Sequence, residues 1–312
     1  MELILNIGLL IGGFVMLIKG ADWFVEGASS IADRFGIPQL VIGLTIVAMG
    51  TSAPEAAVSI SAAFKGSAEI TIGNILGSNI LNVLLILGVT SVICRVPVEK
   101  TTIRYEIPAT IFITALLAYM GLKDQVLIRV EGVILWVFML LYLAYLLWMA
   151  KNGNQPEEES HVVPKPMAAL LVYVAAGILL IVWGSDIAVN GATGIAKIFS
   201  MSERLIGLTI VALGTSLPEL VTSVTAARKG KSDIAVGNIV GSNLFNILFV
   251  VGTTALITPV PYSPSFTFDS IAAVAAMVLL LLCVAPKKAL TRMGGIVLLL
   301  GYAAYFVKLI MG

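Results

Sequence analysis

Residues 43–88 read GLTIVAMGTSAPEAAVSISAAFKGSAEITIGNILGSNILNVLLILG, and residues 207–252 read GLTIVALGTSLPELVTSVTAARKGKSDIAVGNIVGSNLFNILFVVG. Aligned without a gap, the two stretches are identical at 26 of 46 positions. The shared positions include every glycine, proline and asparagine of the first copy, and every glutamate except Glu69, which becomes Asp233. Apolar composition alone does not produce such agreement. The chain therefore contains an internal duplication, and each copy carries polar residues within otherwise apolar segments.

The composition places these segments in a lipid bilayer. Apolar residues make up 59% of the 312 residues, charged residues only 12%, and the mean hydropathy is +1.02. A water-soluble chain of this length needs more polar surface, and a helix needs roughly 20 apolar residues to cross a bilayer. Ten apolar runs meet this requirement, at about 3–31, 38–64, 69–93, 103–122, 128–150, 166–196, 204–227, 232–258, 267–285 and 290–310.

The ten runs divide into two halves of five. A polar linker at 151–165 separates a first repeat at 1–150, with its core at 43–88, from a second repeat at 166–312, with its core at 207–252. Because five crossings is an odd number, the second repeat enters the membrane from the opposite side, as in many secondary transporters. We expect an all-α integral membrane protein with ten transmembrane helices, arranged as two inverted-topology five-helix repeats.

The loop charges predict the orientation. In this topology, twelve lysines and arginines lie on one side of the membrane and six on the other. Cytoplasmic loops carry the excess of positive charge, so the linker at 151–165 is expected in the cytoplasm and both termini outside it. The predicted location is the cell (inner or plasma) membrane, which the chain crosses many times.

Each repeat places one glutamate near the centre of an apolar helix, Glu55 in the first and Glu219 in the second. Placing an acidic side chain there costs roughly 2.5–3.5 kcal/mol on insertion scales, so it normally pairs with another side chain or has a functional role. A glutamate that only locks two helices together is the structural alternative. That alternative is weakened because the apolar stretches around both glutamates contain no lysine or arginine, and because the glutamate recurs in both repeats.

Prolines precede both glutamates, at Pro54 and Pro218. Proline removes a backbone hydrogen bond and, with the nearby glycine, loosens the helix. We expect freed carbonyls around 48–51 and 212–215, where they can coordinate ions. A simple packing kink does not explain the hydroxyl groups that gather near each glutamate at spacings of three and four residues. These hydroxyls belong to Thr51, Ser52 and Ser59, and to Thr215, Ser216 and Ser223.

The next helix of each copy carries polar residues on one face, because they recur at i, i+4 and i+8. The two sets are Asn74, Ser78 and Asn82, and Asn238, Ser242 and Asn246. Glycines four residues apart on the same helices let a neighbouring helix approach closely. Asn74 and Asn238 fit either a helix–helix contact or an ion ligand, whereas Asn82 and Asn246 are the better ligand candidates.

The candidate ligands are all oxygen atoms, from carboxylates, hydroxyls, amides and carbonyls. Such ligands suit hard cations, namely calcium, sodium or magnesium, and disfavour zinc or copper. The single histidine, His161, lies in the linker. Two carboxylates balance one divalent cation, or they are shared by several monovalent ones. Because an empty, doubly negative site is costly to move across a membrane, competition between ions for this site would couple their transport.

These motifs resemble the two alpha repeats of the calcium/cation antiporter superfamily, and more closely its prokaryotic sodium/calcium exchanger branch. GTSAPE and GTSLPE, each followed by GNI, GSN and then Asn82 or Asn246, carry the resemblance, which covers all ten expected helices. It implies an ion-binding core formed by the second, third, seventh and eighth helices, with the first and sixth sliding across it. The ligands it implies for transported calcium and sodium are Glu55, Glu219, Thr51, Ser52, Ser78, Asn82, Thr215, Ser216, Ser242, Asn246 and the carbonyls of Ala48 and Ala212.

Asn246 bears on the subclass, since potassium-dependent exchangers and some prokaryotic members carry aspartate at this position. Asparagine at both Asn82 and Asn246 is similar to the potassium-independent type. The resemblance therefore implies secondary active, electrogenic antiport of sodium for calcium by alternating access, normally with calcium moving outward. No cofactor, nucleic-acid partner or obligate protein partner is expected.

Other functions fit the sequence less well. Proton/calcium antiport is the close alternative, because Glu55 and Glu219 could titrate when no ion is bound, and potassium-dependent exchange is a more distant one. A cation channel does not require inverted halves with broken helices. An enzyme is disfavoured because the repeats contain no serine–histidine pair, no zinc-ligand spacing and no aspartate dyad.

Overall fold

The computed structural model describes residues 2–152, 166–199 and 212–311, and these form helices joined by short loops. The first half contains α1 (Glu2–Phe35), α2 (Gln39–Ile42), η1 (Gly43–Val47), α3 (Ala48–Thr51), α4 (Ala53–Phe64), α5 (Glu69–Leu81), η2 (Asn82–Ile86), α6 (Leu87–Ile93), η3 (Thr102–Glu106), α7 (Ile107–Asp124) and α8 (Arg129–Asn152). The second half contains α9 (Met167–Ile198), α11 (Ala212–Gly214), α12 (Leu217–Arg228), α13 (Ser232–Phe245), η5 (Asn246–Val251), α14 (Gly252–Ile257), η6 (Pro264–Phe266), α15 (Thr267–Val284) and α16 (Arg292–Met311).

Among the described residues, eight helical segments are long and apolar enough to cross a membrane, and a ninth is broken. The broken segment joins Gln39–Thr51 to Ala53–Phe64 at a bend of 50°. These nine correspond to nine of the predicted runs. Of the tenth run, α11 and α12 are described, whereas 204–211 lie outside the described residues, as do linker residues 153–165. The start assigned to the linker is corrected slightly, because α8 continues through Lys151 to Asn152.

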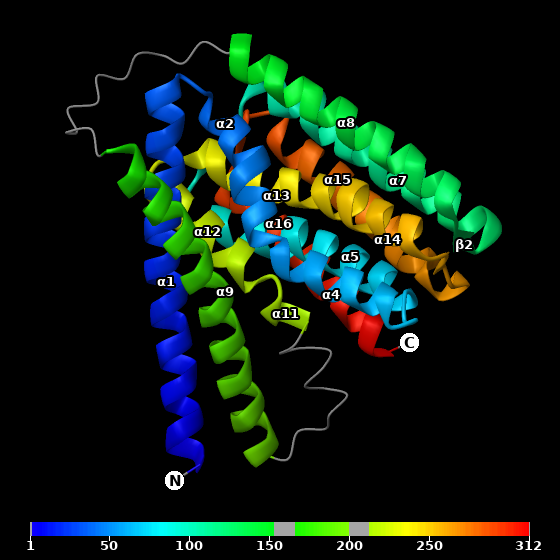
Figure 1. The fold of residues 1–312 in the computed structure, drawn as a ribbon, viewed down its shortest axis with the longest axis horizontal. Coiled ribbons are helices and arrows are strands. Elements are labelled where there is room, and N and C mark those ends of the chain that lie inside the picture. Colours follow the sequence, from blue (N-terminus) through cyan, green and yellow to red (C-terminus); the bar gives the residue numbers. More distant parts are fainter. Residues whose placement is uncertain (1, 153–165, 200–211, 312) are drawn as a thin grey trace.

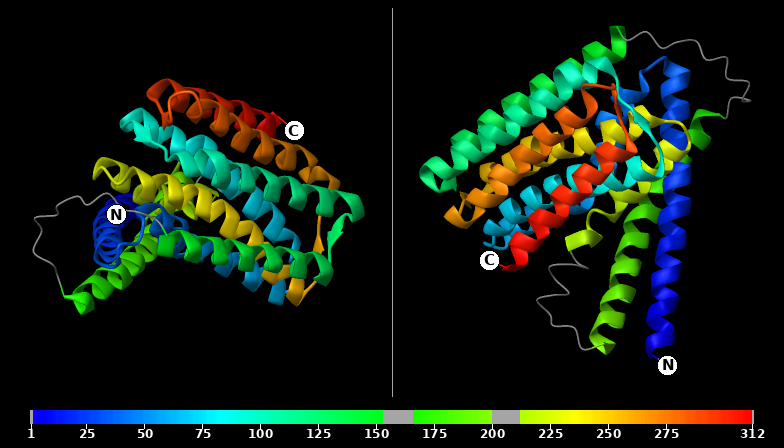
Figure 2. Two further views of the ribbon diagram at one scale, coloured as in Figure 1. Left: turned by 90° about the horizontal axis from the view of Figure 1, so that it is seen from above. Right: turned by 180° about the vertical axis from the view of Figure 1, so that it is seen from behind.

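Helices α1 and α9 lie side by side and project beyond the other helices (Figure 1, Figure 2). Glycines make this close contact possible. A β-carbon at Gly13 would lie 2.7 Å from the Gly184 carbonyl oxygen, and one at Gly20 would lie 2.8 Å from the Gly177 carbonyl oxygen. The early part of α1 thus meets the later part of α9, so the two helices are antiparallel. Gly13 corresponds to Gly177, and Gly20 to Gly184, in the sequence repeat, so corresponding residues contact one another reciprocally.

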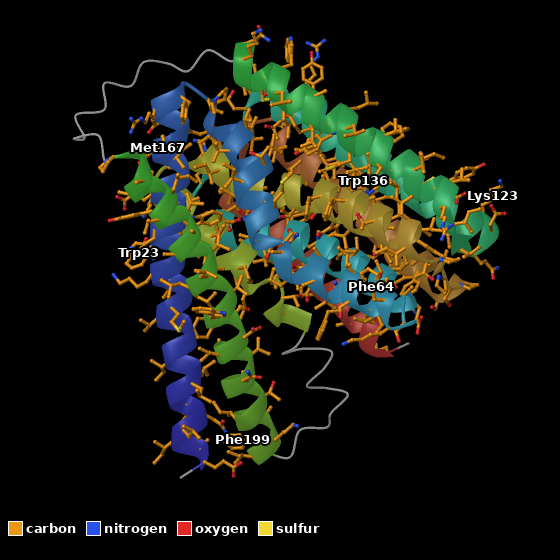
Figure 3. All side chains as sticks on the ribbon, in the orientation of Figure 1. Trp23, Phe64, Lys123, Trp136, Met167 and Phe199 are labelled. Atoms are coloured by element: carbon orange, nitrogen blue, oxygen red, sulfur yellow. The ribbon has the colours of Figure 1, made fainter. Side chains whose placement is uncertain are left out.

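The centre of the molecule is formed by α5–η2–α6 and α13–η5–α14, which are mostly buried. Helix α13 packs against α2, η1 and α3, and α4 packs against η5 and α14. Gly237 and Gly241 allow this approach, since a β-carbon at either would lie within 3 Å of backbone atoms of Leu40 or Leu44. The outer surface instead exposes large apolar side chains, including Trp23 and Phe64 (Figure 3), as a lipid-facing surface does.

Two small sheets connect loops from opposite halves. β1 (Val96–Pro97) pairs antiparallel with β4 (Ala289–Leu290), and β2 (Val126–Leu127) pairs antiparallel with β3 (Val260–Pro261). The all-α prediction did not include them, because a strand of two residues is too short to show an alternating pattern.

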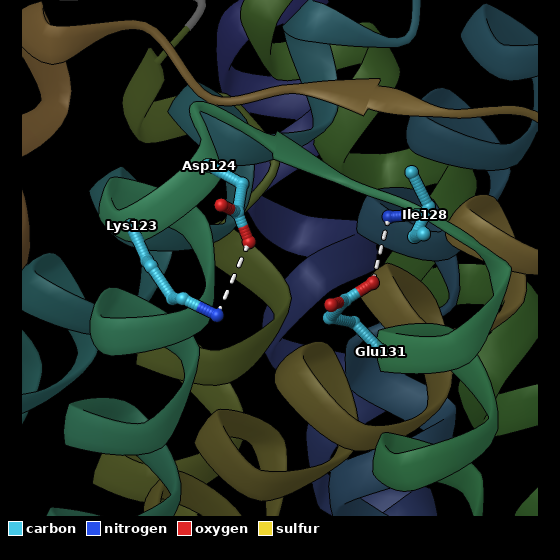
Figure 4. A network of polar contacts seen from close by, with 4 residues as sticks. All are labelled: Lys123, Asp124, Ile128 and Glu131. Carbon is cyan, nitrogen blue, oxygen red and sulfur yellow. Dashed lines mark hydrogen bonds and ion pairs between the residues drawn. The ribbon is translucent and has the colours of Figure 1, made fainter.

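The turn between α7 and α8 is held by local polar contacts (Figure 4). Helix α7 ends at Asp124, and Gln125 takes a left-handed conformation with φ of 56°. The backbone N–H of Ile128 donates to Glu131 Oε2 at 3.0 Å, and Lys123 lies 3.7 Å from Asp124. The Glu131 carboxylate thereby satisfies a backbone donor at the start of α8, where helices leave such groups unpaired.

Candidate cation-binding site

Both glutamates lie in the first turn of a helix that follows a break. Ser52, with φ of −83° and ψ of 7°, separates α3 from α4, and Ser216, with φ of −94° and ψ of 3°, precedes α12. Pro54 and Pro218 occupy the first turns of the new helices, where the missing N–H is harmless. The breaks therefore place each carboxylate at a helix N-terminus, which favours negative charge.

The structure brings the predicted residues of the two halves together. Glu55 is 1% exposed and Glu219 is fully buried. Ser52 Oγ donates to Glu219 Oε1 at 2.9 Å, while Thr215 and Ser216 lie beside the Glu55 carboxylate. The two carboxylates are close enough for their charges to interact. The hydroxyl groups at each helix break therefore lie beside the glutamate of the opposite half.

The Ala48 carbonyl departs from the prediction that it is freed. It accepts hydrogen bonds from the Ser52 N–H at 3.0 Å and Ser242 Oγ at 3.4 Å, and it lies 3.3 Å from Thr51 Oγ1, whose single proton has a nearer acceptor in Asn238 Oδ1. The physical reason is that the missing N–H of Pro54 releases the carbonyl four residues earlier, which belongs to Gly50. Ala212, the counterpart of Ala48, is the first residue of α11, and its role as a ligand stays a prediction.

Asn74 and Asn238 make helix–helix contacts, one of the two interpretations that the sequence left open. Asn74 Nδ2 donates to Ser59 Oγ at 3.0 Å, and Asn238 Nδ2 donates to Ser223 Oγ at 2.9 Å. Each amide also donates to the backbone carbonyl of the glutamate in the preceding helix. Asn238 Oδ1 in turn accepts from Thr51 Oγ1 at 3.0 Å. These bonds fix the orientation of the helix turns that carry the glutamates.

Asn79 and Asn243 are site residues that helical spacing did not identify. The side-chain amide of each donates to the backbone carbonyl of the other at 3.2 Å. Asn82 Nδ2 donates to Asn243 Oδ1 at 3.0 Å, and Asn246 Nδ2 donates to Asn79 Oδ1 at 3.1 Å. Their presence in both GSN motifs was the available signal, but they lie off the polar face that the spacing identified. These hydrogen bonds occupy the side-chain nitrogens of Asn82 and Asn246 and so fix the orientation of both amides.

Several buried oxygens are left without a hydrogen-bond partner among the described residues. Five belong to predicted ligands: Glu55 Oε2, Glu219 Oε2, Asn82 Oδ1, Asn246 Oδ1 and Ser216 Oγ. An unsatisfied buried polar atom costs roughly 1–3 kcal/mol, so a ligand is the natural explanation. Asn82 and Asn246 each begin a π-helical turn, η2 and η5, and such turns are frequent at functional sites. Ser78, one turn before Asn82, is also buried.

The donor set fits a hard cation. Within the described parts of the chain, no three histidine, cysteine or acidic side chains converge. A cation at this site would therefore meet two carboxylates and neutral oxygens, the ligands that calcium and sodium accept.

Comparison with known proteins assigns the family. The family model described as sodium/calcium exchanger protein matches residues 5–149 and 169–311. The chain belongs to the sodium/calcium exchanger family. It is thus a multi-pass membrane transporter of the calcium/cation antiporter type, as the motifs indicated, and the two matched segments lie in the two halves.

Relatives of this exchanger-family chain match along its whole length. It is 31% identical over 348 residues to the sodium/calcium exchanger MaX1 of Methanosarcina acetivorans, in an alignment that covers 97% of this chain and 98% of that protein. It is 35% identical over 317 residues to the inner membrane protein YrbG of Escherichia coli, in an alignment that covers 98% of this chain and 97% of YrbG. The structure of the sodium–calcium exchanger NCX_Mj soaked with zero sodium and calcium gives a TM-score of 0.84 at 32% identity, over 98% of this chain and 99% of that chain.

Proposed function

We propose that this protein exchanges sodium for calcium across the cell membrane by alternating access. The observation that carries the proposal is the set of unpartnered buried oxygens, with a carboxylate and an amide from each half: Glu55, Asn82, Glu219 and Asn246. Calcium takes six to eight oxygen ligands, including carboxylates and amide oxygens. Two carboxylates neutralise one calcium ion or are shared by sodium ions, so the two species compete for the same atoms.

Some of the other proposed ligands must exchange a present hydrogen bond for the ion. Ser52, for example, now donates to Glu219 at 2.9 Å. A cation bound to Glu219 would repel the hydroxyl proton and attract its oxygen, so the hydroxyl would rotate and become a ligand. The remaining ligands that we propose are the hydroxyl oxygens of Thr51, Ser78, Thr215, Ser216 and Ser242, and the backbone oxygens of Ala48 and Ala212.

The ten-helix, inverted-repeat arrangement is part of this proposal. Its support is the reciprocity of contacts between corresponding residues, such as Gly13 with Gly184 and Gly20 with Gly177. Two halves related by a pseudo-two-fold axis in the membrane plane can exchange conformations, which opens one midplane site to either side. We place the repeats at 1–150 and 166–312, α1 and α9 as the moving pair, and both termini outside the cytoplasm.

We further propose that exchange is electrogenic and independent of potassium. Asn82 and Asn246 are neutral, so Glu55 and Glu219 supply the negative charge of the site. A cycle that carries one divalent cation against more than two sodium ions moves net charge. A third carboxylate, which would favour an additional cation, is replaced by the Asn246 amide.

Calcium uptake into proteoliposomes tests the proposal. Vesicles loaded with sodium are diluted into sodium-free buffer containing labelled calcium, at equal pH on both sides and with the membrane potential clamped. Uptake should require the sodium gradient, respond to the clamped potential and be unchanged by potassium. Uptake driven equally well without sodium would sink the proposal, and uptake driven by a pH gradient alone would identify proton/calcium antiport instead.

A further inference from the structure

A second buried carboxylate lies outside the exchange site. Glu106, the last residue of η3, is 2% exposed. Tyr145 of α8 donates a hydrogen bond to Glu106 Oε1, whereas Oε2 is buried and makes no hydrogen bond of good geometry among the described residues, although the Thr102 hydroxyl lies beside the carboxyl group. A buried carboxylate oxygen in this state attracts a hydrogen-bond donor, preferably a charged one.

Glu106 is one of the residues that line a cavity of about 300 Å³. Three tyrosine rings, those of Tyr105, Tyr142 and Tyr145, share its wall with Glu106 and Arg104. Aromatic faces attract cations, and a group of aromatic rings is a common way to recognise an organic ammonium. Because Oε2 needs a donated proton, a primary ammonium fits this cavity better than a quaternary one, which has no N–H group.

The cavity is also lined by Arg104. Arg104 is exposed, its guanidinium lies 5.7 Å from the centre of the Tyr105 ring, and it forms no ion pair with a described residue. Arginine is well suited to binding phosphate. The candidate ligand therefore carries a primary ammonium and a phosphate on the same headgroup.

The depth of the cavity suits a lipid headgroup. The apolar span begins at Thr102, and Glu106 lies four residues further along. At about 1.5 Å per helical residue, this places Glu106 only about 6 Å inside the end of the span. Arg104 lies between Thr102 and Glu106, so both charged residues are at the level where headgroups meet the hydrocarbon region.

We propose that this cavity binds the headgroup of an ethanolamine phospholipid, with its ammonium on Glu106 and its phosphate on Arg104. The headgroup also contacts Tyr142, whose hydroxyl donates to the Leu44 carbonyl at 3.1 Å. Leu44 lies in η1, directly before α3 and the exchange site. Bound lipid thus contacts a residue that holds the broken helix. The proposal concerns lipid binding and does not depend on which ions are exchanged.

Lipid binding is measured on the purified, full-length protein by native mass spectrometry and by thermal stability in detergent. The probes are phosphatidylethanolamine, phosphatidylcholine and phosphatidylglycerol with identical acyl chains, and free ethanolamine as a competitor. Wild type should bind phosphatidylethanolamine at least about fivefold more tightly than the other two lipids, the ratio expected for about 1 kcal/mol of headgroup contacts. Glu106→Gln should remove this preference.

Asp269→Asn is the matched control. Asp269 accepts a hydrogen bond from Tyr305 at 2.8 Å, an acid–tyrosine pair like Glu106–Tyr145, and it does not line the cavity. This variant should retain the preference of wild type. If Glu106→Gln fails to fold, the exposed Arg104→Gln substitution tests the same site and should reduce the preference.

Three results would overturn the proposal. The first is equal binding of all three lipids by wild type, and the second is an unchanged preference in both the Glu106 and Arg104 variants. The third is displacement of the lipid by free ethanolamine at micromolar concentration, which would assign the cavity to a soluble amine.

Discussion

In the central amide cluster, formed by Asn79, Asn82, Asn243 and Asn246, the first half and the second half make the same contacts. Asn79 and Asn243 donate to each other's carbonyl at the same distance, 3.2 Å, and each orients the ligand amide of the opposite half. At the edge, where the α12–α13 turn meets α1, the halves differ. Lys229 Nζ lies 3.2 Å from Asp22 Oδ1 and donates to the Asp22 carbonyl at 2.9 Å.

The residues that correspond to this pair in the repeat are Lys65 and Asp186. Both are exposed, and neither forms an ion pair with a described residue. The conformation therefore breaks the symmetry of the sequence at the edge of the molecule. The central amides are used equally by both halves, whereas one of two equivalent ion pairs is formed at the edge. The contacts of these central amides should therefore be insensitive to which half is altered, and the edge contacts should be sensitive to it.

The largest expected effect tests the equivalence of the two carboxylates. Glu55→Gln and Glu219→Gln should each reduce sodium-dependent calcium uptake by at least about thirtyfold, because removing one partner of a buried charge interaction costs about 2–5 kcal/mol. Both variants should still insert, since glutamine preserves the shape. The exposed Glu69→Gln is the matched control and should transport normally. A strong effect at only one of the two sites would contradict equal contributions from the halves.

A packing contact without a counterpart gives the next effect. Tyr262 is fully buried, its hydroxyl lies 2.7 Å from Ser270 Oγ, and a β-carbon at Gly121 would overlap its ring. The position that corresponds to Tyr262 in the repeat holds Val98, which has a much smaller side chain. Gly121→Ala should lower stability by about 1–3 kcal/mol, the usual cost of overpacking.

The measurement is the midpoint of thermal unfolding in detergent, followed by tryptophan fluorescence. Gly12→Ala is the control, because a β-carbon at Gly12 meets no atom within 4 Å. An equal midpoint for Gly121→Ala and Gly12→Ala would show that the Tyr262 contact is adaptable.

The central amides predict a smaller effect. Asn79→Ala and Asn243→Ala each remove a hydrogen bond that orients a ligand amide, worth about 1–1.5 kcal/mol, and should weaken calcium affinity roughly fivefold to tenfold. The maximal exchange rate should change less, because these residues position ligands. Calcium-dependent uptake curves separate the two quantities. Asn152→Ala, at the exposed end of α8, is the control. A fall in maximal rate with unchanged affinity would argue against a positioning role.

Much of the fold follows from the sequence, because membrane helices are long and apolar and the motif is repeated. The nine described spans, the breaks before Glu55 and Glu219, and the closeness of the two glutamates were predictable in this way. Helical spacing identified Asn82 and Asn246 because each lies on a polar face. It could not identify Asn79 and Asn243, because their partners are in the opposite repeat, and spacing within one helix carries no information about contacts between repeats.

Neither the two-residue strands nor the choice of ion pair could be predicted from the sequence, for different reasons. Strands this short have no periodicity, and their pairing depends on loops brought together by the helices. For the ion pairs, the sequence supplies Asp22 with Lys229 and Asp186 with Lys65 on equal terms. Only the conformation decides which pair is formed, so one sequence is compatible with either.

The smallest expected effect concerns these ion pairs and tests the comparison most directly. If the halves exchange conformations, the state opposite to this one forms Lys65–Asp186 and opens Lys229–Asp22. Asp22→Asn should then disfavour the present conformation and Asp186→Asn should favour it. Each shift should be at most about fivefold, because a half-exposed ion pair contributes about 0–1 kcal/mol.

Spin labels at the exposed positions Ile4 and Tyr119, on α1 and α7, report the populations through their distance distribution, after Cys94 and Cys283 are replaced. The two substitutions are chemically identical and occupy corresponding positions, so each is the control for the other. Opposite shifts, both reduced in 1 M salt because exposed charges are screened, would follow from exchange between the halves. Shifts in the same direction would mean that the Lys229–Asp22 contact only stabilises the fold and takes no part in switching.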